Sequence, residues 1–176
     1  LNLRVGNFYD EKIQSEFCGK FDLVILKDVI EHLPNQESVM KILKQFLKKD
    51  GIIFFGFPPW CMPFGGHQQI AINKLGKLPY YHILPRAIYK FVLKNIFRQP
   101  EGTIIALLEV HDTKISINRF ERCVKDAGMK ILRREFFLIN PIYKFKFGLM
   151  PRRQLPILKS IPLVRDFFTT CCYYII

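Results

Sequence analysis

Acidic and imidazole side chains lie close together just after a short apolar run. Asp28, Glu31 and His32 follow residues 21–26, and their spacing is i, i+3 and i+4. In a helical turn this spacing places three side chains on one face. Carboxylates and an imidazole on one face could move a proton or hold a divalent ion. The alternative for His32 is structural: it packs against the next helix with one ring nitrogen hydrogen-bonded.

A second candidate is His67, in the segment Phe-Gly-Gly-His-Gln-Gln. It follows the next apolar run, and we expect it on a flexible loop. An imidazole there could accept a proton from a hydroxyl group. We predict His67, His32 and Glu31 as catalytic residues. A divalent ion held by these three and Asp28 is the alternative to our prediction of no metal, and a simple loop histidine is the alternative for His67.

The surrounding pattern predicts one βαβ unit. Residues 21–26 form a continuous apolar run, which indicates a strand covered on both faces. Pro34 and Asn35 open a helix, Gly51 follows its end, and residues 52–57 predict a second strand that Pro58 stops. In such sheets ligands bind outside the carboxyl ends of parallel strands. The site is therefore expected at residues 27–32 and just after Phe57.

The rest of the chain predicts a helical insertion and a return to the sheet. Residues 60–100 form the insertion, residues 104–110 a strand, and Ser116 to Gly128 a capped helix. Residues 130–139 and 167–176 predict two further strands, separated by an irregular segment, 141–166. A short strand is also expected within residues 1–10. The fold class is α/β, with a partial Rossmann-like sheet that is mostly parallel and ends in an antiparallel hairpin.

The net charge of +12 is concentrated in two segments without acidic residues. Residues 60–100 and 141–165 each hold six lysines and arginines. Such a field attracts an anionic partner, or it forms a solvated basic face. Within the first segment one helix carries apolar residues on one side and four basic residues on the other: Arg86, Lys90, Lys94 and Arg98. This arrangement is typical of a helix that lies on a membrane surface.

The cysteines and the hydropathy pattern argue against a disulfide-rich, zinc-binding or membrane-spanning protein. The five cysteines include no C-x-x-C pair, which argues against a disulfide framework or a zinc site and favours a reducing compartment. No apolar run reaches about 18 residues, so a transmembrane helix is not expected. We predict a cytoplasmic protein with peripheral membrane contact and no nucleic-acid partner.

The order of these elements resembles the second half of a class I S-adenosylmethionine-dependent methyltransferase. The resemblance is carried by Gly6-Asn7, the strand at 21–24, Asp28 to Leu33, the segment 47–58, the helix from Ser116 to Gly128 and the final residues 173–176. It implies S-adenosylmethionine as cofactor. Asn7 would bond the adenine amino group, and Lys27, Asp28 and Val29 would line the methionine portion. For Asn7 a turn residue is the alternative, and for Lys27 an exposed strand end.

The glycine-rich loop of that family is absent from this sequence, and by position it would precede Leu1. We therefore expect a chain that lacks the start of its domain. The predicted division is a methyltransferase core at 1–59, a basic substrate cover at 60–103, further core at 104–140 and 167–176, and a basic insertion at 141–166. The predicted function is methyl transfer to oxygen of a small anionic or lipid-linked acceptor. The alternative is a non-catalytic module that binds a membrane surface or an anionic ligand.

Overall fold

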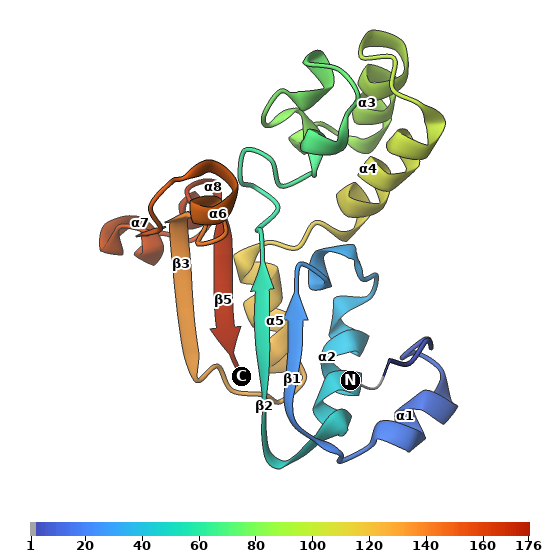
Figure 1. The fold of residues 1–176 in the computed structure, drawn as a ribbon, viewed down its shortest axis with the longest axis vertical. Coiled ribbons are helices and arrows are strands. Elements are labelled where there is room, and N and C mark those ends of the chain that lie inside the picture. Colours follow the sequence, from blue (N-terminus) through green and yellow to red (C-terminus); the bar gives the residue numbers. More distant parts are fainter. Residues whose placement is uncertain (1–2) are drawn as a thin grey trace.

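A five-stranded sheet organises the chain (Figure 1). The computed structural model describes residues 3–176. The strand order is β1-β2-β5-β3-β4, with β1 parallel to β2 and every later pair antiparallel. The predicted α/β class is confirmed, but the sheet is mixed rather than mostly parallel, because one pair of strands is parallel and three pairs are antiparallel. The strands are β1 Phe21–Lys27, β2 Leu47–Phe57, β3 Arg133–Ile139, β4 Arg152–Arg153 and β5 Cys171–Ile175.

The helices fall into three groups along the chain: those beside the sheet, those of the insertion after β2, and the short ones after β3. Within residues 3–176 no helix is both long and apolar enough to cross a bilayer. The α-helices are α1 Glu11–Phe17, α2 Gln36–Phe46, α3 Arg86–Phe91, α4 Glu101–Thr113, α5 Ile117–Asp126, α6 Tyr143–Phe147, α7 Pro156–Ser160 and α8 Val164–Phe167; single turns are η1 Ile30–His32, η2 Gln68–Ile70, η3 Leu75–Lys77, η4 Tyr81–Ile83 and the π-helical η5 Val92–Ile96.

The predicted βαβ unit is present as β1, α2 and β2. Asn35 caps α2, because its side chain accepts a hydrogen bond from the Ser38 amide. The buried residues of α2 recur at helical spacing and face the sheet. The chain enters β2 directly at Leu47, which is earlier than the predicted break at Gly51.

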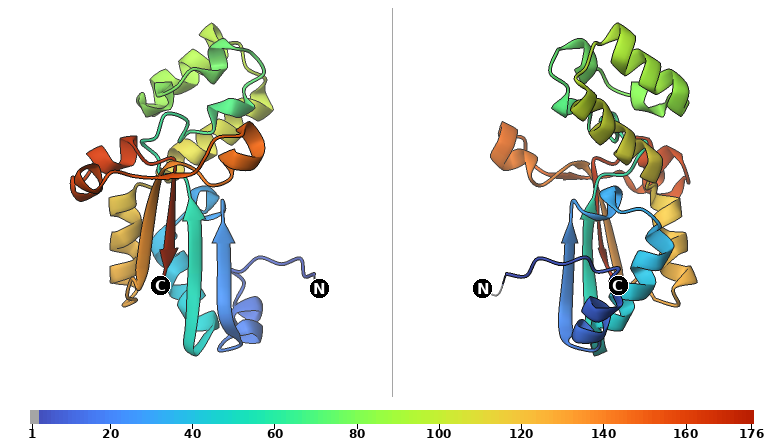
Figure 2. Two further views of the ribbon diagram at one scale, coloured as in Figure 1. Left: turned by 60° about the vertical axis from the view of Figure 1, so that its left-hand side comes forward. Right: turned by 90° about the vertical axis from the view of Figure 1, so that its right-hand side faces the viewer.

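Helices α2 and α5 cover one face of the sheet, as the two views of Figure 2 show. Ser116 caps α5 through its hydroxyl, as predicted, and Gly128 follows the helix with a positive φ of 64°. Phe120 of α5 packs against Phe55 and Tyr174 of the sheet, with ring centroids 5.0 and 4.6 Å away. This aromatic cluster lies at the centre of the main core.

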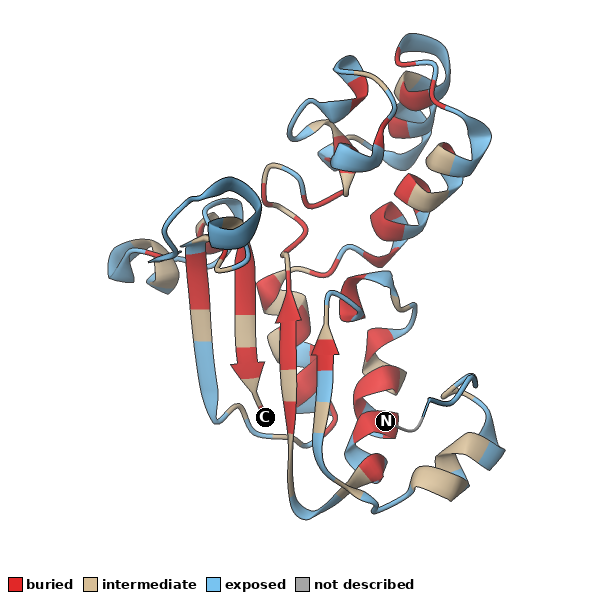
Figure 3. Cartoon of the chain, viewed as in Figure 1, coloured by how far each residue is buried: buried red, intermediate tan, exposed pale blue. Residues whose placement is uncertain are grey.

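Strand β1 is open on its other face, which corrects the prediction of a strand covered on both sides. Leu23 is 48% exposed and Ile25 is 62% exposed, and Figure 3 shows the contrast with the second half of β2, which is mostly buried. Within residues 3–176, β1 is the first strand of the sheet and pairs only with β2. An apolar cavity of about 420 Å³ lies beside it, lined partly by Phe8 and Ile13.

The strand predicted at residues 104–110 is wrong, because these residues belong to α4. Their buried members, Ile104, Leu107, Leu108 and Val110, recur at helical spacing. With Tyr89 and Leu93 three of them form a second core inside the insertion. Helix α4 therefore packs with the insertion, while the predicted division of the chain into parts stays a prediction.

Smaller differences concern the ends of elements. Residues 3–10 form no strand, and the predicted strand's first two residues lie outside the described part of the chain. Instead Asp10 caps α1, a helix that the sequence pattern did not predict. The expected helix from Arg86 is interrupted by the wider turn η5. The last strand begins at Cys171 rather than at 167.

Candidate functional site

The carboxyl ends of β1 and β2 meet at one edge of the sheet (Figure 1). Their parallel register pairs Lys27 with Gly56. The Asp28 amide then donates a hydrogen bond of 2.7 Å to the Gly56 carbonyl. The predicted neighbourhood of Asp28 and the end of β2 is therefore confirmed, and it sets the position of everything that follows either strand.

The turn η1, directly after β1, is held from two sides. Ile30, the first residue of the turn, is fully buried in the main core. Above it, the Thr113 hydroxyl at the end of α4 lies 2.5 Å from the Glu31 carbonyl, and Arg119 donates to the Thr113 carbonyl. The sequence pattern does not indicate Thr113, because it predicts a strand at residues 104–110, where the structure has α4. The insertion thus fixes the main chain of the residue that carries the Glu31 carboxyl group.

His67 lies on a tightly packed turn, not on the flexible loop expected from its glycines. A Cβ at Gly65 would lie 2.0 Å from the Trp60 carbonyl oxygen, and one at Gly66 would lie 2.4 Å from the His82 Cβ. Both glycines are thus required by close approach rather than by mobility. His82 is fully buried, as expected of an insertion core residue, and its ring nitrogens contact the Trp60 carbonyl and the Gln68 amide.

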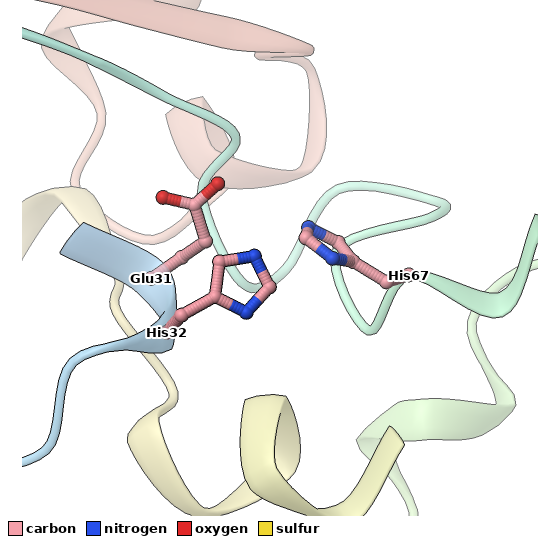
Figure 4. A group of neighbouring side chains, drawn as sticks. All are labelled: Glu31, His32 and His67. Carbon is pink, nitrogen blue, oxygen red and sulfur yellow. The ribbon is translucent and has the colours of Figure 1, made fainter. Parts of the chain in front are cut away.

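These two turns bring Glu31, His32 and His67 together (Figure 4). A ligand atom of each lies within 4.8 Å of those of the other two, and the two imidazole centroids are 4.8 Å apart. The three thus form an acid-imidazole group with one oxygen and two nitrogen donors. Asp28, which the sequence suggested as a fourth member, stands outside this group and pairs with Lys27 instead.

The buried carboxyl group of Glu31 has an unusual electrostatic environment. Glu31 is 2% exposed, and neither of its carboxyl oxygens has a hydrogen-bond partner within residues 3–176. Burial raises the pKa of Glu31 to about 7, and the negative charge of Asp28 acts in the same direction. Burial also lowers the pKa of His67 to about 4, with a smaller effect from His32. Near pH 7, His67 is neutral and Glu31 is poised between its two charge states.

Three of the four residues predicted to contact a cofactor lie at this edge: Lys27 ends β1, and Asp28 and Val29 follow it. Asp28 and Val29 are exposed, and Asp28 has a left-handed backbone with φ 54°. The Lys27 side chain lies against Gly56, and a Cβ at position 56 would lie 2.7 Å from the Lys27 Cδ atom. The Asn7 side-chain oxygen accepts a bond from the Tyr9 amide at 3.0 Å, which matches the alternative of a turn residue. Their roles toward a cofactor stay predictions.

Two tyrosines also border the edge and were not singled out from the sequence. Tyr173 of β5 lies beside Gly56, and burial raises its pKa to about 12. Tyr143 of α6 is half-buried, and burial raises its pKa, with contributions from Cys171 and Asp28. Nothing in the spacing of Tyr143, far along the chain, indicates this proximity.

Comparison with known proteins finds a family match for the first part of the chain. Residues 2–55 match the family described as "Methyltransferase domain". That stretch contains β1, η1, α2 and most of β2, and with them two members of the acid-imidazole group. Residues 2–55 are thus similar to a methyltransferase domain, as the sequence resemblance implied. The resemblance drawn from the sequence is therefore confirmed.

A curated protein similar to a short part of this chain is the "Ubiquinone biosynthesis O-methyltransferase" of Glaesserella parasuis. It is 43% identical over 35 residues, which is 20% of this chain and 15% of the relative. The matched stretch is thus a small part of either protein. The methyltransferase family implies use of S-adenosylmethionine.

The packing of Gly66 leads to a testable prediction. Gly66→Ala should lower the free energy of unfolding by about 1–3 kcal/mol, because the new methyl group collides with the fixed His82 ring system. Denaturant unfolding followed by circular dichroism measures this loss.

The matched control is Gly102→Ala in α4, where an added Cβ meets nothing within 4 Å. It should cost no stability, since alanine is favoured over glycine in a helix. Equal stability of the Gly66 variant and the wild type would contradict the close packing of the His67 turn.

Proposed function

We propose that this protein transfers the methyl group of S-adenosylmethionine to an oxygen atom of a small acceptor. The observation that carries the proposal is the acid-imidazole group, which joins an unpartnered buried carboxyl group to two imidazoles at the edge where β1 and β2 end. The name of the relative, an O-methyltransferase, supports oxygen as the acceptor atom. The bound cofactor supplies an electrophilic methyl group on sulfonium.

The protein's own contribution is to orient the acceptor hydroxyl and to receive its proton. His32 is exposed and His67 is partly buried, so their ring nitrogens can reach an acceptor. With its pKa near 4, His67 is neutral and can accept a hydrogen bond, but it is a weak base. Glu31, whose pKa is about 7, is better matched to the proton. Because Glu31 is covered, the proton reaches it through an imidazole.

The positive charge of the insertion bears on the nature of the acceptor. The insertion exposes Lys74, Lys77, Lys90 and Lys94 and holds no acidic residue between Trp60 and Pro100. Arg86, by contrast, is bound to Asp112 of α4 and so ties α3 to α4. A basic cover of this kind favours an anionic acceptor, or one linked to an anionic lipid. Alignment of such an acceptor accounts for much of the expected rate.

Variants of the acid-imidazole group test the proposal. With 3,4-dihydroxybenzoate as an anionic hydroxyl-bearing probe, His67→Ala and Glu31→Gln should each reduce the rate of methyl transfer about 10²–10⁴-fold. Calorimetry with S-adenosylmethionine should show an unchanged affinity for both variants, since neither residue is placed at the cofactor side.

The pH profile separates the roles of the two residues. The wild-type rate should rise as pH passes through about 7, because Glu31 accepts a proton only when ionised. Glu31→Gln should remove this step. If the wild type gives no heat with millimolar S-adenosylmethionine, or if the step persists in Glu31→Gln, the proposal fails.

A second candidate is a divalent cation held by Glu31, His32 and His67. The specific observation in its favour is the fit of the donor set, one carboxylate and two imidazoles within 4.8 Å, with both carboxyl oxygens unpartnered in the described chain. Such donors suit manganese, zinc or related ions. The cation would act as a Lewis acid that favours the ionised acceptor oxygen.

Thermal unfolding with manganese tests this second candidate. At 100 times its dissociation constant, a cation bound only to the folded state adds about 2.7 kcal/mol of stability. The midpoint should rise for the wild type and for Asp28→Asn, because Asp28 lies outside the donor group. It should not rise for His67→Ala. Loss of the effect in Asp28→Asn, or its survival in His67→Ala, would contradict the assigned donors.

A further inference from the structure

The segment that follows β3 exposes large apolar side chains at the same sheet edge as the site. We call residues 142–152, which include helix α6, the α6 loop. Phe145 is 82% exposed, Phe147 is 65% exposed and Met150 is 64% exposed. These values exceed those of Ile88, Phe91 and Ile96 on the basic helix of the insertion. Figure 3 shows the α6 loop almost entirely in the colour of exposed residues.

The exposure is imposed by a hydrogen-bonded structure. The Tyr143 amide donates to the Asn140 carbonyl, and the Ile142 amide to the Asn140 side chain. At the other end Gly148, with φ 68°, donates to the Lys144 carbonyl and closes the helix. Downstream, the buried Gln154 bonds the Arg165 carbonyl and the Thr169 hydroxyl. The two phenylalanines are therefore held outward by a fixed turn.

The charged residues of the α6 loop are basic and form no ion pairs within residues 3–176. No acidic residue occurs between Pro141 and Arg165. Lys144, Lys146 and Arg152 are exposed, and within residues 3–176 none of them forms an ion pair. Later in the segment, Arg165 is instead buried against Glu121. The α6 loop therefore offers uncompensated positive charge beside its apolar side chains.

The location of the α6 loop links it to the site. Strand β3 runs in the same direction as β1 and β2, because β5 is antiparallel to both β2 and β3. The α6 loop therefore starts from the edge that carries η1, as Figures 1 and 2 show. Tyr143 lies close enough to Asp28 for that charge to raise its pKa.

We propose that the α6 loop is an anchor for anionic lipid bilayers. Phe145 and Phe147 enter the region of the headgroups and upper acyl chains, and Lys144, Lys146 and Arg152 meet the lipid phosphates. Apart from these cations, the exposed side chains of the α6 loop offer apolar contact rather than hydrogen bonds. Such a surface matches a lipid interface better than base edges or a polar protein surface. The anchor would hold the edge with the acid-imidazole group close to the bilayer.

Flotation of the protein with vesicles of phosphatidylcholine, with or without phosphatidylglycerol, tests the anchor. The protein should float with the anionic vesicles and much less with the neutral ones. Raising the salt concentration should weaken binding, since each basic residue contributes roughly fivefold to the partition coefficient. The variant with Phe145→Ser and Phe147→Ser should bind anionic vesicles at least tenfold more weakly than the wild type. Its thermal unfolding midpoint should equal that of the wild type.

Two control variants separate this surface from others. Ile157→Ser removes an apolar side chain that is 78% exposed on α7, outside the α6 loop, and should bind within twofold of the wild type. The variant with Lys90→Glu and Lys94→Glu tests the basic helix of the insertion and should retain most binding. Sedimentation of the wild type and the phenylalanine variant in the absence of lipid should give the same mass.

The anchor is overturned if the wild type does not float with anionic vesicles, or if the phenylalanine variant binds them fully. It is also overturned if Ile157→Ser loses as much vesicle binding as the phenylalanine variant. A wild-type dimer that the phenylalanine variant abolishes would overturn it as well. The last result would assign the α6 loop to a contact between two copies of the chain. None of these readouts depends on methyl transfer, so the proposed function stands or falls separately.

Discussion

The parallel register between β1 and β2 is the constraint on which the site depends. It places Asp28 opposite the end of β2, and the bond from the Asp28 amide to Gly56 fixes that alignment. Glycine at 56 leaves room for Lys27 to cross the sheet toward Tyr173. Because β1 and β2 both end at the same edge of the sheet, the turns that follow these two strands must approach each other. A shift of one residue would turn every side chain to the other face.

The insertion after β2 positions both parts of the acid-imidazole group. Its last helix holds the main chain of Glu31 through Thr113, and its buried His82 sets the turn that carries His67. Both contacts join residues distant in sequence to the two halves of the acid-imidazole group. The cost of burying the Glu31 carboxyl group is visible in its pKa of about 7, and such perturbed groups are typical of functional sites.

The sequence could predict those features that depend on local pattern. Ser116 predicts its helix as a cap, Pro34 and Asn35 predict the start of α2, and the run at 52–57 predicts β2. Capping and short apolar runs act over a few residues. The run at 104–110 was misread, since continuous apolar residues suit a buried strand or a buried helix equally; the Pro100-Glu101 start was the signal for α4. Tertiary contacts that residue spacing cannot reveal produce three further features. These are the hydrogen bond from Thr113 to Glu31, the position of Tyr143 near Asp28 and the open face of β1.

The central claim is that Glu31 and His67, from two separate turns, share one electrostatic environment. A double-mutant cycle on the free energy of unfolding, with Glu31→Gln, His67→Ala and both together, measures their coupling without any acceptor or cofactor. Residues this close should show a coupling energy of at least about 0.5 kcal/mol. Effects that simply add, within the experimental error of such cycles, would contradict the claim that the two turns meet.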